Sequence, residues 1–343
     1  MGRLRLNDAE GSGTAASIAA LDWIGDGTGR SAPFRRPIQS GGSRRSPRAC
    51  GFLLLLLGLA SGWADDFVFI DNGELRLGVK KSSGAGIAYL ALSATGENVI
   101  NHWDRGRLVQ QSYYGAEDGS LWNKKPWRWN PVQGGDWHGN PAQVLELKAE
   151  RDSLYAKSMG KHWASGADLP DVIFEEWISL TGRLAHVKFR MTYTGTNTHP
   201  KISHELPAVF VEPQYHTLLV YEGTNVWRGD AVNRSKPGWP NESRKFTEHW
   251  AAYVDKNDFG VGALVPVADS LTCYRFGDGK REHGSCSYFA PVKRFAITPG
   301  MKFEYDVWLT IGSAKEIRQR FGKIDSRGFG ADGDGKRRIP VEP

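Results

Sequence analysis

The stretch Lys302–Ile311, with the sequence KFEYDVWLTI, alternates apolar and polar residues at every second position. Successive side chains of a strand point to opposite faces, so this period of two predicts a β-strand with one buried face. The side chains predicted to point inward are Phe303, Tyr305, Val307, Leu309 and Ile311, and those predicted to point outward are Lys302, Glu304, Asp306 and Thr310.

Leu184–Tyr193, with the sequence LAHVKFRMTY, repeats this pattern, with Val187, Phe189, Met191 and Tyr193 on the inner face. Period-two alternation dominates after residue 65, and helical periodicity is scarce. Further strand candidates are Phe67–Ile70, Leu75–Val79, Ile87–Leu92, Arg107–Tyr113, Gln143–Ala149, Val172–Leu180, Ala208–Val211, Thr217–Tyr221, Ala251–Val254, Val261–Val265 and Arg294–Ile297.

This many strands requires two packed sheets or a barrel. We therefore expect an all-β protein, a large two-sheet antiparallel β-sandwich in a single domain at residues 65–325. One short C-terminal helix is predicted at Ala314–Phe321, where Ile317 and Phe321 are four residues apart on one face. Residues 326–343 are predicted to form a flexible tail.

Residues 1–64 have the pattern of a leader that ends in a secretory signal peptide. Arg44, Arg45 and Arg48 precede the apolar run Gly51–Ala60, and small residues stand at Gly62 and Ala64. An apolar run of this length is too short to cross a bilayer, so we expect no stable membrane anchor. The pattern predicts a secreted or periplasmic protein whose mature chain begins near Asp65.

The charge of the chain argues against a nucleic-acid partner. The formal net charge is +6, but residues 1–64 hold eight arginines and four acidic residues, which leaves 36 basic and 34 acidic residues after them. A nucleic-acid-binding domain usually keeps a basic stripe on its folded part. We therefore expect no nucleic-acid partner.

Two cysteines, Cys273 and Cys286, remain after the leader and flank a turn-rich segment. In an exported protein this arrangement predicts either a disulfide across a hairpin or two free buried thiols. The nine histidines show no metal-ligand spacing such as His-x-His or His-Glu-x-x-His. We expect no metal site and no cofactor.

The segment Asn101–Pro141 holds five tryptophans and the pair Tyr113–Tyr114 among amide, guanidinium and carboxylate groups. Flat aromatic rings match the C–H face of a sugar, and the polar groups match its hydroxyl edge. The loop Gly223–Trp239 has a similar mixture, and long loops often carry binding residues. The side chains predicted to bind a carbohydrate are Arg107, Gln111, Tyr114, Trp127, Trp129, Asp136, Trp227 and Trp250.

The candidates for acid–base chemistry are His138, His204, Glu205 and Glu248. Because adjacent strand residues point to opposite faces, His204 and Glu205 cannot both face one cleft unless a bulge intervenes. A histidine suits proton transfer near neutral pH, whereas a glutamate needs burial to hold a proton. The alternative is structural: a solvated loop histidine at His138, and a rim histidine beside a salt-bridged Glu205.

The succession of Arg107 on an early strand, His138 in a loop, His204 at a strand entrance and the later Glu248 resembles the galactose-mutarotase-like superfamily over about residues 66–322. Asp104–Gly115 also resembles a secreted bacterial family. The superfamily resemblance implies a β-supersandwich, hydroxyl binding by Arg107, and acid and base roles for the histidines and Glu248. The Asn-His-x-Tyr-x-Asn stretch of the aldose epimerases is absent, and Trp137–Asn140 stands only loosely in its place.

The sequence therefore predicts a secreted carbohydrate-active enzyme, a polysaccharide lyase or glycoside hydrolase with a histidine–carboxylate pair in an aromatic-lined cleft. The alternatives are a carbohydrate-binding protein without catalysis, an aldose-epimerase-like enzyme, and a structural envelope protein whose tryptophans lie in the core.

Overall fold

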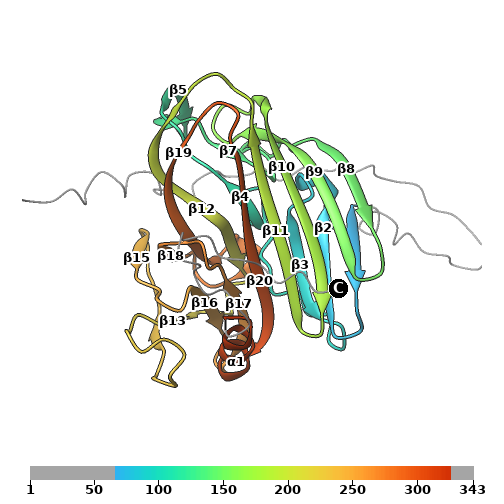
Figure 1. The fold of residues 1–343 in the computed structure, drawn as a ribbon, viewed down its shortest axis with the longest axis vertical. Coiled ribbons are helices and arrows are strands. Elements are labelled where there is room, and N and C mark those ends of the chain that lie inside the picture. Colours follow the sequence, from blue (N-terminus) through green and yellow to red (C-terminus); the bar gives the residue numbers. More distant parts are fainter. Residues whose placement is uncertain (1–65, 326–343) are drawn as a thin grey trace, which may run out of the picture.

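The computed structural model describes residues 66–325 (Figure 1). The predicted leader and signal peptide at 1–64 and the predicted tail at 326–343 lie outside the described residues. The elements are β1 (Phe67–Asp71), β2 (Leu75–Lys80), η2 (Lys81–Ser83), β3 (Ile87–Leu92), β4 (Val109–Ser112), β5 (Glu117–Trp122), β6 (Lys125–Arg128), β7 (Pro131–Val132), β8 (Val144–Ala149), β9 (Ser153–His162), β10 (Asp168–Thr181), β11 (Leu184–Tyr193), β12 (His199–Val211), β13 (Thr217–Val220), β14 (Asn233–Ser235), β15 (Glu242–Arg244), β16 (Trp250–Val254), β17 (Phe259–Leu264), β18 (Ser270–Phe276), η3 (Arg281–His283), β19 (Cys286–Ile297), β20 (Lys302–Ser313) and α1 (Ala314–Asp325).

Antiparallel pairing arranges most of the strands in two long sheets, and β5 and β6 form a separate two-stranded sheet. Sheet one runs β8-β9-β10-β11-β20-β17-β16-β13-β14, and its β11, β10, β9 and β8 lie side by side in Figure 1. Sheet two runs β1-β2-β3-β4-β12-β19-β18-β15. The short strand β7 pairs with both β4 and β9 and so connects the two sheets. The predicted all-β sandwich is confirmed.

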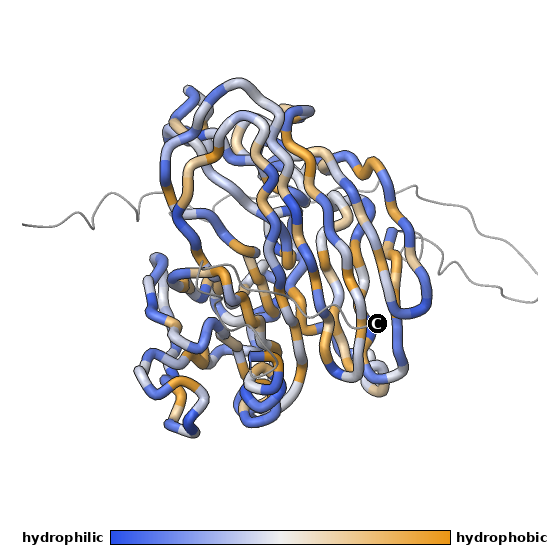
Figure 2. The backbone as a smooth tube through the Cα atoms, in the orientation of Figure 1, coloured by the Kyte–Doolittle hydropathy of each residue, from blue (hydrophilic) through white to orange (hydrophobic). Residues whose placement is uncertain are grey.

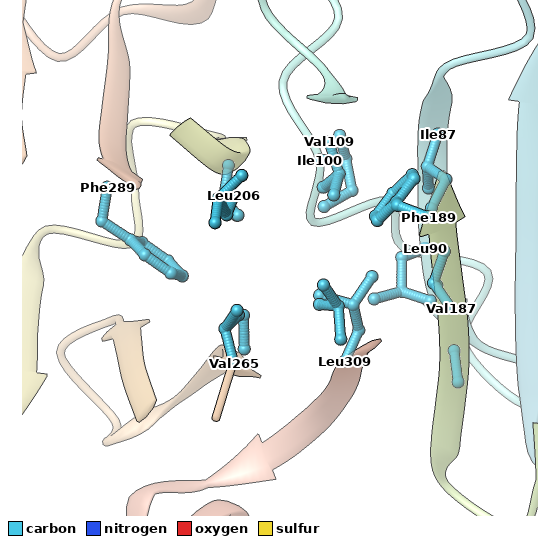
Figure 3. Close-up of a cluster of buried hydrophobic side chains, with 14 of the residues drawn as sticks. Ile87, Leu90, Ile100, Val109, Val187, Phe189, Leu206, Val265, Phe289 and Leu309 are labelled. Carbon is cyan, nitrogen blue, oxygen red and sulfur yellow. The ribbon is translucent and has the colours of Figure 1, made fainter. Parts of the chain in front are cut away.

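The main core lies between the sheets. Figure 3 shows Val187, Phe189 and Leu309 of sheet one facing Ile87, Val109 and Leu206 of sheet two. Hydrophilic and hydrophobic residues alternate along the long strands, as Figure 2 shows. This alternation stabilises the sandwich because each strand contributes every second side chain to the core.

The predicted inner faces of β11 and β20 are confirmed, since Val187, Phe189, Val307 and Leu309 are fully buried. Thr310, predicted to point outward, does so but is also buried. The reason is α1, whose Arg320 donates a hydrogen bond from Nη1 to Thr310 Oγ1 at 3.0 Å.

The predicted helix exists and extends to Asp325, beyond the predicted end at Phe321. Its Ile317 and Phe321 pack on the outer face of sheet one, where they contact Trp250 and Trp308 in a second apolar cluster. In the described part of the chain, no helix has the length and apolar character needed to cross a bilayer.

Cys273 and Cys286 are buried free thiols, so the predicted disulfide is wrong and its alternative holds. The strand register gives the reason: Cys273 pairs with Phe289, whereas Cys286 pairs with Phe276. Cys273 belongs to the core between the sheets, and Cys286 belongs to a cluster on the outer face of sheet two. The two sulfur atoms therefore lie on opposite faces of the sheet.

Candidate functional site

A pocket opens on the outer face of sheet two, above β4, β12, β18 and β19. We call it the Glu205 pocket, and it is lined by Gly106, Gln110, Ser112, Tyr114, Asn130, Val132, Trp163, Glu205, Ala208, Phe210, Asn241, Tyr274 and Tyr288. Its walls thus combine residues of the predicted Asn101–Pro141 segment with strand residues that are far away in the sequence. Among the described residues of its lining, Glu205 is the one carboxylate.

A bulge in β12 turns Glu205 toward this pocket. Glu205 pairs with Ser112 and Ala208 pairs with Gln110, so β12 advances three residues while β4 advances two. The additional residue changes the parity of the strand. Glu205, Ala208 and Phe210 therefore all face the pocket, while Val209 remains in the core.

Hydroxyl groups surround the Glu205 carboxylate. Tyr288 donates its phenolic hydrogen to Oε1, and Ser112 and Tyr114 also hydrogen-bond the carboxylate. Burial raises the pKa of Glu205, and these three hydrogen bonds partly offset that rise because they favour the ionised form. A carboxyl group with a raised pKa keeps its proton to a higher pH than an ordinary carboxyl group does, which suits it to proton transfer.

The tyrosines of the pocket act as donors rather than bases. Burial, followed by the charge of Glu205, raises the pKa of Tyr114 and of Tyr288 well above the usual value of a phenol. Tyr274 is also buried, and its hydroxyl has no hydrogen-bond partner among residues 66–325. This hydroxyl is therefore available to an oxygen atom of a ligand.

Asn130 connects the pocket to the tryptophan-rich segment. Its Nδ2 donates to the Tyr113 carbonyl oxygen at 2.7 Å, and its Oδ1 accepts from the indole Nε1 of Trp127 at 3.2 Å. Trp127 itself packs with Trp122 and Trp163 beside the pocket. Trp163 is part of the pocket lining, and Trp122 and Trp127 pack against it outside the lining.

The pocket is narrow in this structure. Its cavity volume is about 20 Å³, which is room for about one water molecule. The indole of Trp239 stands next to the lining, with its ring centroid 5.0 Å from that of Tyr274 and the planes at 89°. This indole is 40% exposed, so an aromatic surface lies next to the pocket and is open to solvent.

The structure brings two of the sequence-predicted residues, Glu205 and Tyr114, into the pocket, and it places His204 elsewhere. His204 is fully buried on the opposite side of β12, with its ring 4.2 Å from that of Phe295. Its Nδ1 accepts from the Tyr114 amide at 3.1 Å, and its Nε2 donates to the Phe295 carbonyl at 3.0 Å. Burial lowers the pKa of His204 to about 4. Both ring nitrogens of His204 are therefore occupied by hydrogen bonds to the backbone, which gives this histidine a structural role.

Arg107 and Gln111 do not line the pocket. Arg107 pairs with Asp104 at 3.3 Å and donates a hydrogen bond to the Gly284 carbonyl. These contacts give Arg107 a structural role near the start of β4. Gln111 points between the sheets, where its Nε2 donates to the carbonyl of Glu175 at 3.2 Å. The face of β4 that reaches the pocket carries Gln110 and Ser112 instead.

Glu248, Trp227 and Trp250 form a separate structural unit with α1. Arg318 binds both carboxylate oxygens of Glu248, at 2.6 and 3.0 Å. The same carboxylate accepts from the Trp227 amide at 2.7 Å and from the Trp250 indole at 2.8 Å. With all of these partners and full burial, Glu248 fixes the helix against the sheet and lies away from the pocket.

Asp136 and His138 are also apart from the pocket. Asp136 accepts hydrogen bonds from the Asn140 amide and from its side chain, at 2.8 and 2.7 Å, and so closes its own loop. His138 is exposed and lies beside Trp137. Trp129 stacks on His199 at 3.8 Å between ring centroids and belongs to the core. Within residues 66–325, no cluster of three or more His, Cys, Asp or Glu side chains could hold a metal ion.

Several pocket residues were not predicted from the sequence. Tyr274 lies on β18, which was not among the candidates, and Tyr288 lies on the part of β19 that precedes the predicted strand Arg294–Ile297, although each tyrosine alternates with core residues at period two. Tyr274 and Phe276 share one face, as do Tyr288 and Ala290. That alternation was the available signal for the two tyrosines. Asn130 lies within the predicted Asn101–Pro141 segment but was not singled out, and nothing in the local sequence marks Trp163 or Asn241 as pocket residues.

No family model and no curated protein sequence matches the chain. Similar solved structures include a galactose mutarotase related enzyme from Lactobacillus acidophilus, with 10% identity, coverage of 72% of this chain and 97% of that chain, and a TM-score of 0.49. Galactose mutarotase-like proteins from Lactobacillus casei (10% identity, 71% and 99%, TM-score 0.46) and Clostridium acetobutylicum (9%, 72% and 95%, TM-score 0.46) are also similar. At these identities the likeness concerns the fold, and no residue role follows from it.

Proposed function

We propose that the protein acts on carbohydrates and that Glu205 is its proton-transfer group. The observation that carries this proposal is a buried carboxyl group with a raised pKa, surrounded by the hydroxyls of Ser112, Tyr114 and Tyr288 at the wall of a pocket. The ligand class is inferred from the exposed indole of Trp239 next to the pocket and from the many hydroxyl and amide groups in its lining.

The number of carboxylates in the pocket argues against one reaction class, glycoside hydrolysis. Glycoside hydrolysis commonly uses two carboxylates across the scissile bond, and the described pocket lining offers one. Lyases and aldose epimerases instead move protons at a sugar ring, which one acid–base group and neutral donors can do. We therefore favour a lyase or epimerase over a hydrolase. In this reaction Glu205 takes or gives the proton, and Tyr274 holds a substrate oxygen.

A second candidate is carbohydrate binding without turnover. The narrow cavity supports it, because a sugar ring needs far more room than one water molecule occupies. Catalysis requires that the side chains of the pocket move apart when substrate arrives.

We further infer that the protein works outside the cytoplasm, and the support for this is the signal-like pattern Arg44–Ala64.

The experiment is a substrate screen with the wild-type protein and Glu205→Gln. Polarimetry detects epimerisation of free aldoses, ultraviolet absorbance detects unsaturated uronates from a lyase, and a reducing-end assay detects hydrolysis. We expect one of the first two activities, and a loss of roughly 100-fold or more in Glu205→Gln. Exposed His138→Ala is the control and should keep full activity. Activity that survives Glu205→Gln contradicts the proposed role, and binding without any activity supports the second candidate.

A further inference from the structure

A second pocket lies at the end of β12. We call it the Trp103 pocket, and it is lined by Lys80, Asn101, His102, Trp103, Glu212, Arg281 and Glu282. Its cavity volume of about 650 Å³ falls in the range of small-molecule binding sites. None of these residues takes part in the Glu205 pocket.

Trp103 presents an open aromatic surface in this pocket, with 55% of the residue exposed. The Trp103 amide donates to Asn101 Oδ1 at 3.2 Å, which fixes the backbone under the ring. The indole edge lies against Gly284, where an added Cβ would come within 2.9 Å of Nε1. Gly284 has a φ of 71°, a backbone conformation that favours glycine. Glycine at this position therefore both permits the turn and leaves room for the Trp103 ring.

Glu212 supplies a buried acceptor with unused capacity. Its side chain is 2% exposed, and Oε1 lies 3.2 Å from Arg281 Nε. Its Oε2 has no hydrogen-bond partner among the residues that the structure describes. Burial raises the pKa of Glu212 to about 7. Buried polar atoms are rarely left unpaired, so an unpaired oxygen at a pocket wall indicates a ligand or water position.

The charges of this pocket favour a neutral ligand. Lys80 and Arg281 balance Glu212 and Glu282 in the lining. The two basic residues also lower the pKa of His102, after the larger effect of burial. An indole beside a lone carboxylate would suit an organic cation, but the two basic side chains oppose one. A sugar has an apolar face for the indole and hydroxyl donors for Glu212.

The two pockets follow one side of the same strand. Phe210 lines the Glu205 pocket, and Glu212, two residues later, lines the Trp103 pocket. The period of two places both side chains on the outer side of β12, while Val211 between them is in the core. Glu212 lies seven positions after Glu205, a span of roughly 20 Å along an extended strand. A glycan chain of several units can cover this span.

We propose that the Trp103 pocket binds a neutral sugar unit of the same glycan whose other end occupies the Glu205 pocket. The indole of Trp103 stacks on the ring of that unit, and Glu212 Oε2 accepts a hydrogen bond from one of its hydroxyl groups. This inference rests on the proposed function for the polymeric nature of the ligand. The inference predicts that the affinity of the protein increases with the length of the glycan chain.

The test compares short and long ligands by calorimetry and by quenching of tryptophan fluorescence. The probes are cello-, manno- and xylo-oligosaccharides of two and of six units. For the wild-type protein we expect at least one six-unit probe to bind more tightly than its two-unit counterpart. Trp103→Ala and Glu212→Gln should each lower the affinity for the six-unit probe about 10-fold or more. Each variant should therefore lose the advantage of length, which is the tighter binding of the six-unit probe relative to the two-unit probe.

The matched control is Trp137→Ala, which removes another exposed indole that lines neither pocket. It should retain the advantage of length, and thermal unfolding should show that all variants are folded. Equal affinity of the wild type for both lengths, or an unchanged advantage in Trp103→Ala, overturns the inference. In that case the proposed function still stands if Glu205→Gln loses turnover. A length advantage that depends on Trp103 supports the inference whether or not the probes are turned over, because the substrate screen with Glu205→Gln decides the proposed enzyme separately.

Discussion

Tyr288 of β19 donates its phenolic hydrogen to Glu205 of β12, across two strands that pair within sheet two. The donor is itself buried, and its pKa is raised well above that of a free phenol, first by burial and then by the charge of Glu205. The tyrosine therefore stays protonated and stabilises the ionised carboxylate. Of the three hydrogen bonds that oppose the effect of burial on the pKa of Glu205, the one from Tyr288 is the largest.

Tyr288→Phe should shift the pH dependence of turnover. Burial raises the pKa of Glu205 and the Tyr288 hydroxyl opposes that rise, so removal of the hydroxyl should raise the pKa further. The limb of the pH–rate profile that belongs to Glu205 should move to higher pH, whether Glu205 acts as acid or as base. The measurement is kcat/KM as a function of pH with the substrate found in the screen.

Tyr155→Phe is the control for this shift. Tyr155 also donates to a glutamate, Glu175 at 2.9 Å, but it does so on the outer face of sheet one. Its removal should leave the profile unchanged. A Tyr288→Phe profile identical to that of the wild type would show that Glu205 does not titrate in the reaction.

Glu176 should make the protein less stable as pH rises. It is completely buried on the core side of β10, where Gln133 Nε2 donates to Oε2 at 3.2 Å and Oε1 has no partner among the described residues. Burial raises the pKa of Glu176 from 4.5 to about 8. Between these values the folded state holds a proton that the unfolded state has released, so the free energy of unfolding falls with rising pH.

Glu176→Gln should remove this fall. The stability contributed by the protonated carboxyl is fully present below pH 4.5 and is lost as the pH rises toward about 8, at on the order of 1.4 kcal/mol per pH unit. Urea unfolding across this range should show that the free energy of unfolding of Glu176→Gln increases relative to that of the wild type as the pH rises. Exposed Glu150→Gln is the control. Parallel curves for wild type and Glu176→Gln would mean that Glu176 is not held protonated.

The alternation of β11 and β20 was enough to predict a sandwich, because period two reports directly which side chains face the core. The same reasoning separated His204 from Glu205, since neighbouring strand residues point to opposite faces. It could not tell which of the two reaches a pocket. That depends on the bulge after Glu205, which appears in the register of β12 with both of its neighbours, β4 and β19.

The tryptophan-rich segment was predicted to be a single sugar-binding surface, and the structure divides it. Trp129 supports the core, Trp127 supports a pocket wall, and Trp103 is exposed at a different pocket. Composition reports what a segment contains, whereas burial depends on strands that pack against it from elsewhere in the chain. Gln111 shows the same limit, because its polarity suggested a ligand and its partners are backbone carbonyls between the sheets.

The two cysteines should be unreactive in the folded protein. Burial raises the pKa of Cys273 to about 12 and that of Cys286 to about 11, so neither forms the reactive thiolate at neutral pH. In a Cys50→Ser variant, which removes the third cysteine, a thiol reagent should label the chain only after unfolding. Reducing agent should leave the thermal unfolding temperature unchanged. A lower temperature after reduction would contradict the opposite facing of the two thiols.

Glu248→Gln should destabilise the protein without acting on the chemistry of the Glu205 pocket. The variant leaves Arg318 largely buried without its counter-charge, and loss of one partner of a buried pair costs about 3 kcal/mol or more of unfolding free energy. Urea unfolding should show this loss, and kcat at a temperature where the variant is folded should match that of the wild type. Lys148→Met removes an exposed pair with Glu146 and should leave the free energy of unfolding nearly unchanged, because solvent screens this pair. A purely structural carboxylate changes the fraction of protein that is folded and not the rate at which the folded protein reacts. A large loss of kcat in folded Glu248→Gln would therefore support the catalytic role of Glu248 that the sequence first suggested.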